Sequence, residues 1–97
     1  MLLDKEALAM GEELPERIIK YFSEVLKQER EKQGLTVEQL ASAVEEDIEV
    51  IELLESGEVD KLNDVPAGVM FYVASKLNID FGETFISVRR RAMEELK

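Results

Sequence analysis

Turn-forming residues divide this chain into lengths that suit helices, and this constrains the fold more than any other feature. The breakers are Gly11, Pro15, Gly34, Gly57, Pro66 and the Asp80-Phe81-Gly82 stretch. Between them, apolar residues recur every three or four positions, which is the period of an amphipathic helix, and no alternating strand pattern is present. The spacing predicts an all-α fold of five or six helices.

The first third of the chain predicts two helices. A weak apolar stripe over residues 3–10 indicates a short first helix, and Pro15 fits the first position of a longer one. Gly34 supplies a left-handed C-cap at the end of that longer helix. We therefore expect an N-terminal helical extension over 1–13 and a single domain with a C-terminal helix over 14–97. The stripe consists of Leu3, Ala7 and Met10 and continues in spacing to Leu14, and the apolar face of the longer helix consists of Ile18, Ile19, Phe22, Val25 and Leu26.

Capping residues in the middle of the chain predict two short helices that meet across a tight turn. Thr36 with Gln39 forms a capping box that opens a helix reaching about Val44. Asp47 is the expected N-cap of a helix over 48–56, which Gly57 would close. The inward residues of the first of these helices are Val37, Leu40, Ala41 and Val44.

Two further helices are expected in the last third. Pro66 begins a helix whose inward residues are Met70, Val73, Ala74 and Leu77. Asp80 with Glu83 caps a last helix that reaches about Leu96. In this last helix Phe81, Phe85, Val88 and Ala92 recur at intervals of four, three and four, which is typical of a coiled-coil seam. A homodimer through this seam is therefore one hypothesis.

Composition disfavours catalysis. A chain of 97 residues suits one domain, and this one contains neither cysteine, which would form disulfides, nor histidine, the commonest zinc ligand and general base. No nucleophile motif or phosphate-binding glycine loop is present, and Glu45-Glu46-Asp47 lacks the ligand spacing of a calcium loop. We expect no enzyme activity, no metal and no cofactor.

The lengths of the apolar segments and the first residues of the chain predict where the protein is located. No apolar run approaches the roughly 20 residues that a bilayer requires, so we expect no membrane span in this chain. The first residues, Met-Leu-Leu-Asp-Lys-Glu, do not combine a basic segment with an apolar stretch, as a secretory signal does. We expect a cytoplasmic protein.

Negative charge is concentrated in the middle of the chain. Residues 1–35 carry eight acids and six bases, 36–58 carry eight acids and no base, and 59–97 carry six of each. The three segments therefore contribute −2, −8 and 0 to the net charge of −10. The two short central helices bear most of the imbalance.

The central motif resembles the lambda-repressor-like helix-turn-helix family of the XRE or Cro type. It reads Gly34-Leu35-Thr36-x-Glu38-x-Leu40-Ala41, followed by Ile51, Leu54, Glu55 and Gly57, and the similarity covers residues 22–85. Leu26-Lys27-x-x-Arg30 precedes the motif, and the resemblance implies a buried salt bridge between Arg30 and Glu55. Within this family the chain is closer to the RodZ-type helix-turn-helix domain, through Glu55-x-Gly57-Glu58-x-Asp60-x-Leu62 and a late, aromatic-rich fourth helix.

The RodZ-type resemblance implies a protein partner. Domains of that type contact the actin-like filament protein MreB with aromatic residues of the fourth helix. Phe71 and Tyr72 are the approximate counterparts here, because residues 63–66 run about two positions longer than the pattern. Packing in the core is the alternative role of these two aromatic side chains.

Charge disfavours DNA reading by the third helix, which in repressors of this family enters the major groove. Its start carries five acids and no arginine, lysine, asparagine or glutamine, so phosphates would repel it. Apolar residues among the acids give this surface the character of a protein-binding face, whereas a solvated acidic face is the plainer interpretation. The candidate partner-binding face is Glu45, Glu46, Asp47, Ile48, Glu49, Glu52 and Leu53, together with Phe71 and Tyr72.

Two further features accompany this face. Glu45 stands where the family often has glycine and Glu46 where it often has a buried valine, so we expect a reshaped turn. Arg89, Arg90 and Arg91 form the one basic cluster. Its cations suit the end of a helix and the glutamates four residues on. The alternative contact is a phosphate, an anionic lipid or an acidic protein surface, such as the acidic third helix of a neighbouring subunit.

The sequence as a whole favours a regulatory or adaptor module of helix-turn-helix fold that acts mainly through protein contacts. A DNA-binding transcriptional regulator of the XRE family is the alternative. A second alternative is an antitoxin-like or DNA-mimicking acidic protein, whose carboxylates would occupy a basic groove of its partner.

Overall fold

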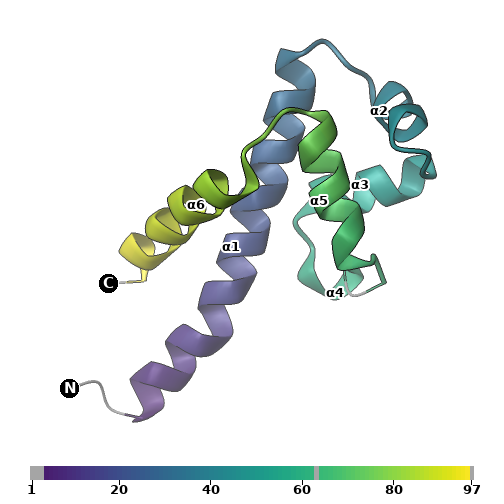
Figure 1. The fold of residues 1–97 in the computed structure, drawn as a ribbon. Helices are drawn as coiled ribbons and strands as arrows, with labels where there is room; N and C mark the ends of the chain where they lie inside the picture. The colour runs from purple at the N-terminus through teal and green to yellow at the C-terminus, as the bar shows by residue number, and fades with distance from the viewer. Residues whose placement is uncertain (1–3, 63, 97) are drawn as a thin grey trace.

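The computed structural model describes residues 4–62 and 64–96, which form six helices and no strand. The helices are α1 (Asp4–Lys32), α2 (Val37–Ala43), α3 (Ile48–Ser56), α4 (Val59–Leu62), α5 (Ala67–Lys76) and α6 (Phe81–Glu95). The long α1 runs through the centre of the molecule, with α6 on one side and α2 to α5 on the other (Figure 1). The all-α prediction is confirmed.

The first helix is longer than predicted. A break before Pro15 was expected, but α1 is continuous and includes this proline. The φ of proline is helical, so a helix can continue through it, although in the interior this costs about 3 kcal/mol because the ring crowds the carbonyl four residues earlier. Inside the helix its missing N–H leaves only the carbonyl of Gly11, four residues earlier, without its usual partner. The expected domain boundary at residue 13 falls within α1 and stays a prediction, and the stripe of Leu3, Ala7 and Met10 lies outside the described side chains.

Three helices end in the same hydrogen-bonding pattern. After α1, Gly34 has a φ of +73°, its N–H donates to the carbonyl of Glu31, and the N–H of Leu35 donates to that of Arg30. This is the Schellman motif, which satisfies carbonyls that a helix end leaves free. The same pattern, with a left-handed residue after the cap, follows α2 at Glu45 and α5 at Asn78. The predicted cap at Gly34 is therefore confirmed.

Helix starts agree with the predicted caps except at one aspartate. Thr36 and Gln39 form both bonds of the capping box, at 2.8 and 3.0 Å. Asp80 accepts a hydrogen bond from the N–H of Glu83 at 3.0 Å. Asp47 is the N-cap residue of α3, as predicted, but its side chain makes no capping hydrogen bond. The single turn of α4 was not predicted.

The core lies where α1, α2, α3, α5 and α6 meet. Leu26, Leu40, Ile51, Leu54 and Leu77 are almost completely buried, and each comes from a sequence position whose helical period or motif pointed inward. Phe22, Ala41, Val44, Val73 and Ala74 are also buried, as predicted, whereas Ile18, Val25, Val37 and Met70 pack around the core and remain half-buried.

The predicted dimer seam on α6 is largely part of this core. Val88 and Ala92 are buried within the chain, on the side of α6 that packs against α1. Phe81 contacts the ring of Phe22 with 4.7 Å between ring centroids. Only Phe85 of the four predicted residues is exposed. Packing within one chain therefore accounts for most of the period of the seam, and a homodimer through this helix stays a prediction.

Candidate partner-binding surfaces

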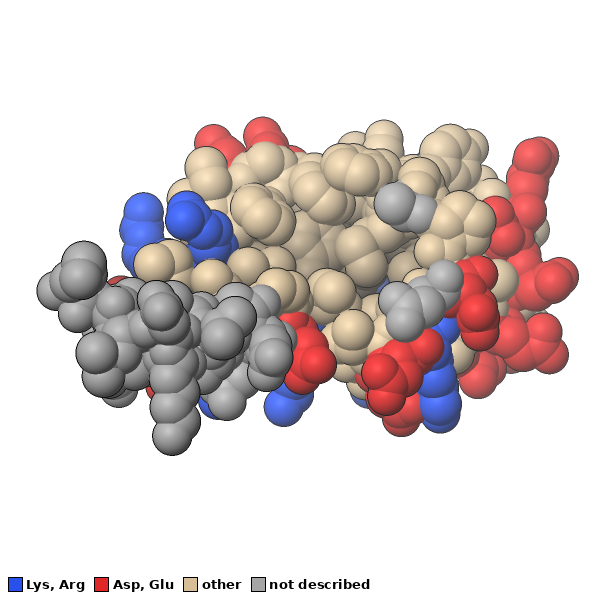
Figure 2. Space-filling view, turned by 90° about the horizontal axis from the view of Figure 1, so that it is seen from below, with Lys and Arg blue, Asp and Glu red and all other residues tan. Residues whose placement is uncertain are grey.

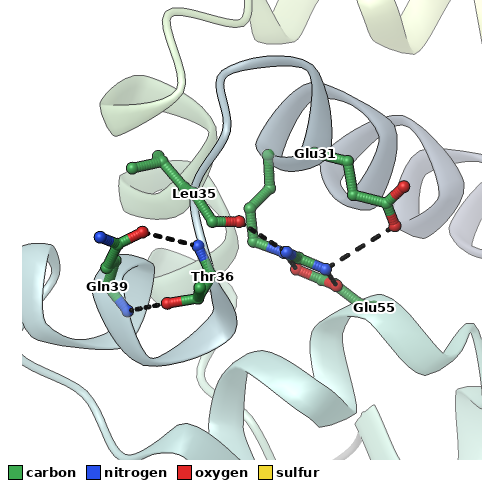
Figure 3. A network of polar contacts seen from close by, with 6 residues as sticks. Glu31, Leu35, Thr36, Gln39 and Glu55 are labelled. Atoms are coloured by element: carbon green, nitrogen blue, oxygen red, sulfur yellow. Dashed lines mark hydrogen bonds and ion pairs between the residues drawn. The ribbon is translucent and has the colours of Figure 1, made fainter.

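A buried ion pair positions α3 against α1 (Figure 3). Arg30 on α1 donates from Nε to Glu55 Oε2 at 2.7 Å and from Nη2 to Glu55 Oε1 at 2.9 Å. Its Nη1 donates to the carbonyl oxygen of Leu35 at 2.7 Å. The hydrogen bond with Glu55 raises the pKa of the Arg30 guanidinium above its ordinary value. The family resemblance implied this pair. Its bidentate geometry fixes the orientation of α3 and of the side chains on its outer face.

The turn between α2 and α3 keeps a compact geometry despite its glutamates. Glu45 has a φ of +57°, the left-handed conformation that a glycine would favour. Its N–H donates to the carbonyl of Ser42, and that of Glu46 donates to the carbonyl of Ala41. The left-handed conformation of Glu45 strains the backbone, and the expected reshaping of this turn relative to the family stays a prediction.

The outer side of α3 combines exposed acids with apolar side chains. Ile48, Glu49, Glu52 and Leu53 fall within one sector of the helix, because successive residues advance by about 100°. Ile48 is 41% exposed, Glu49 and Glu52 are exposed, and Leu53 is half-buried. We call these four residues the α3 face. The exposed Glu45 and Asp47 stand beside it in the preceding turn.

Acidic side chains therefore dominate one end of the molecule. Figure 2 shows them gathered most densely at the end where α2 and α3 meet, while basic side chains stand at the opposite end and along the side between the two ends. Residues 36–58 contain no lysine or arginine, and among the described residues no ion pair involves Glu45, Asp47, Glu49 or Glu52. Their negative charge is not neutralised by the protein itself.

The two aromatic residues of α5 do not belong to the core. Phe71 is 53% exposed and Tyr72 47% exposed. Phe71 stacks on Phe81 with ring centroids 4.0 Å apart, and Lys76 Nζ lies 5.5 Å from the ring centroid of Tyr72. Phe71 also borders an apolar groove of about 270 Å³ whose walls come from five helices and include Ile19 and Leu54. Of the two roles expected for Phe71 and Tyr72, core packing is wrong.

The predicted partner-binding face is divided between two surfaces. Leu54 points from α3 into the groove that Phe71 borders. Glu52 precedes Leu54 by two residues, so its side chain leaves the helix about 200° away from that of Leu54. The acids of the α3 face consequently point away from the groove. The sequence grouped both sets of residues, and the fold does not bring them together.

A polar cluster joins the end of α6 to the middle of α1 and was missed from the sequence. The Tyr21 hydroxyl donates to the Glu95 carboxylate, and Arg17 Nη1 lies 2.9 Å from the same carboxylate. Arg91 stacks on the Tyr21 ring at 3.8 Å and lies 3.5 Å from both Glu24 and Glu95. The hydrogen bond from Tyr21, and then the nearby arginines, lower the pKa of Glu95, while the same bond raises the pKa of Tyr21.

This cluster separates the three consecutive arginines into two roles. Arg91 is occupied in holding α6 to α1, as its contacts show. Arg89 and Arg90 are exposed and make no ion pair in the described part of the chain. Of the local pairs expected on this helix, Arg91 with Glu95 is present and Arg90 with Glu94 is not.

Searches for metal-binding clusters and membrane-spanning helices gave negative results. Within residues 4–62 and 64–96 no group of histidine, cysteine, aspartate and glutamate side chains is arranged to hold a metal ion. No helix in that part of the chain has the length and apolar character to cross a membrane.

Comparison with known proteins gave one match. A family model described as a helix-turn-helix domain matches residues 25–81, which is more than half of the chain and includes α2 to α5. No curated protein and no solved structure matches the chain.

Proposed function

Since this chain belongs to the helix-turn-helix domain family, we propose that it is a non-enzymatic regulatory or adaptor module that acts mainly through protein contacts. The observation that carries the proposal is the α3 face, because it presents unpaired carboxylates beside an exposed isoleucine where a DNA-reading member would need cations.

Electrostatics decides between DNA and protein as the ligand. The recognition helix of such a domain approaches phosphates to within the Debye length of about 8 Å, where charges are poorly screened. The exposed Glu45, Asp47, Glu49 and Glu52 would lie inside that distance with no base between them. Release of counterions from DNA by protein cations supplies most nonspecific affinity, and here its source is absent from the approaching helix. An acidic rim around Ile48 suits a basic protein surface with an apolar centre instead.

The exposed aromatic residues of α5 support a second contact region and a placement within the family. We infer that the chain is of the RodZ type, on the basis of Glu55-x-Gly57-Glu58-x-Asp60-x-Leu62 and the aromatic α5. Phe71 and Tyr72 are exposed, as a contact role for them requires. Large aromatic side chains at the rim of an apolar groove commonly contribute strongly to protein interfaces.

Binding to nucleic acid provides the first test. The protein should pass through heparin at low salt and leave a random-sequence DNA duplex unshifted. A variant with Glu49→Gln and Glu52→Gln removes two negative charges without adding a cation, and a variant with Glu29→Gln and Glu31→Gln on α1 is its control for net charge. A duplex shifted by the wild-type protein, with an affinity that falls steeply with salt, would contradict the proposal.

Site-specific crosslinking provides the second test. A photoreactive residue replaces Glu52 on the α3 face, Tyr72 on α5, or the exposed Lys27 on α1 as a control. In the native cell, the first two positions should capture protein and the third should not. Crosslinks that are equal at all three positions, or that form only with nucleic acid, would contradict a dedicated protein-binding surface.

A further inference from the structure

The outer side of α6 carries an apolar and basic surface that packing within the chain does not use. Phe85, Ile86, Arg89, Arg90 and Met93 fall within one sector of about 140° on this helix, while Val88 and Ala92 point inward. Ile86 is 57% exposed, more than any other large apolar residue among those described. We call Phe85, Ile86, Arg89 and Arg90 the α6 face.

The α6 face complements the α3 face in charge. Each face consists of two apolar and two charged residues at positions i, i+1, i+4 and i+5 of its helix, although the order differs: the charged residues are Glu49 and Glu52 on α3 and Arg89 and Arg90 on α6. Such a set spans about one and a half helical turns, about 7.5 Å along the axis. Two carboxylates and two guanidiniums therefore come within reach of each other when the apolar residues of the two faces meet.

The two faces cannot meet within one molecule. In Figure 1 α3 and α6 lie on opposite sides of α1. The buried Arg30–Glu55 pair holds α3 in place, and the Tyr21–Glu95 cluster holds the end of α6. Only a second molecule brings an α6 face to an α3 face.

We propose that the α6 face of one chain binds the α3 face of a second copy, in a head-to-tail contact. This inference rests on the proposed function, because it names a partner for the α3 face. The contact is heterologous, so a pair of chains retains one free α3 face on one copy and one free α6 face on the other, and association proceeds beyond a dimer unless a ring closes. Its small area places it among weak, transient interfaces. A chain bound in this way has its α3 face covered, so self-association and binding of another protein exclude each other at that face.

Ionic strength sets the conditions under which the contact forms. With a net charge of −10, whole molecules repel one another when salt is low. At about 0.15 M salt, a Debye length of about 8 Å screens that long-range repulsion more than the close pairs in the contact. At about 1 M salt the Debye length of about 3 Å weakens the pairs themselves. Self-association should therefore be strongest at intermediate salt.

Sedimentation equilibrium of charge-reversal variants tests the contact. The wild-type protein should show a reversible increase in mean mass as its concentration rises from micromolar to millimolar. Arg89→Glu with Arg90→Glu should weaken the association at least about tenfold, and Glu49→Lys with Glu52→Lys should do the same. The chain carrying all four substitutions should associate again, because the complementary charges are exchanged and not lost. The exposed pair Lys27→Glu and Lys32→Glu, with the same charge change as the arginine variant, should retain the wild-type behaviour at intermediate salt.

Each contrary outcome identifies what has failed. Circular dichroism first establishes that every variant is folded, as expected for exposed positions. A wild-type protein that stays monomeric throughout, or a fourfold variant that does not regain association, overturns self-recognition. Crosslinks from position 52 to a different protein would still support the proposed function in that case. Wild-type binding to DNA overturns the proposed function, whether or not the arginine variant loses self-association.

Discussion

Replacing Arg30 with methionine tests the claim that one ion pair positions α3. Methionine fills part of the space of the arginine side chain and provides no hydrogen-bond donor. Glu55, whose side chain is 8% exposed, then loses both charged hydrogen bonds, and the carbonyl of Leu35 loses a third. Breaking a buried pair from one side typically costs about 3 to 5 kcal/mol, because the remaining charge stays buried. Glu31, at 3.8 Å from Arg30, contributes little because it is largely exposed.

This loss is large for a domain of 97 residues. At about 0.05 to 0.15 kcal/mol per residue, the whole free energy of unfolding amounts to roughly 5 to 15 kcal/mol. Urea denaturation followed by far-ultraviolet circular dichroism should show a strongly lowered midpoint for Arg30→Met. If the slope of the transition is unchanged, the change reflects stability and not the compactness of either state. Lys27→Met, on the exposed side of the same helix, should stay within about 0.5 kcal/mol of the wild-type protein.

The double variant separates pairing from packing. Glu55→Leu alone leaves the Arg30 cation without its main partner. Arg30→Met alone leaves the Glu55 carboxylate without its two charged hydrogen bonds. With both substitutions no buried charge remains, so the double variant should be more stable than the sum of the single losses predicts, by about 2 kcal/mol or more. Single losses below about 1 kcal/mol, or losses that simply add, would refute the reasoning that α3 is held by this pair.

Three further substitutions address the turn, the capping box and the α1–α6 cluster. Glu45→Gly should raise the free energy of unfolding by about 1 kcal/mol because it removes left-handed strain, whereas the control Glu46→Gly should lower it. Thr36→Ala should lower it by about 1 kcal/mol through loss of the capping bond, which urea midpoints would detect. Since the pKa of Glu95 is lowered in the folded protein, its ionised form stabilises the fold above the ordinary value near 4.5, and this contribution is lost as the pH falls. The free energy of unfolding should therefore fall less between about pH 7 and about pH 3 in Tyr21→Phe than in the wild-type protein. An equal fall in both proteins would contradict the hydrogen bond from Tyr21 as the cause of the lowered pKa of Glu95.

Local signals predicted where most helices begin and end. The box of Thr36 and Gln39 and the left-handed Gly34 act through hydrogen bonds between residues close in sequence, so their geometry follows from residue type. Pro15 shows the limit of such signals, since α1 continues through it despite the local cost of an interior proline. Glu45 shows the opposite limit, because its neighbours impose a conformation that its own residue type disfavours.

The candidate surfaces were less predictable than the helices. The acidic character of the α3 face was evident because it depends on composition over a short range. The position of Phe71 and Tyr72 outside the core, the burial of Val88 and Ala92, and the joining role of Tyr21 were not. Each of these depends on which helix packs against which side of another.

The sequence by itself determined the helical class, the capped turn between α1 and α2, the concentration of negative charge and the pair of residues that joins α3 to α1. Only the tertiary structure decided which side of α6 is covered by α1. On the covered side Val88 and Ala92 are buried in the core, and on the other side Phe85, Ile86, Arg89 and Arg90 are exposed. The physical reason is that caps and helical periods arise from neighbours in the chain. Burial, in contrast, is a property of contacts between residues far apart in it, and an amphipathic helix does not specify the partner that covers its apolar side.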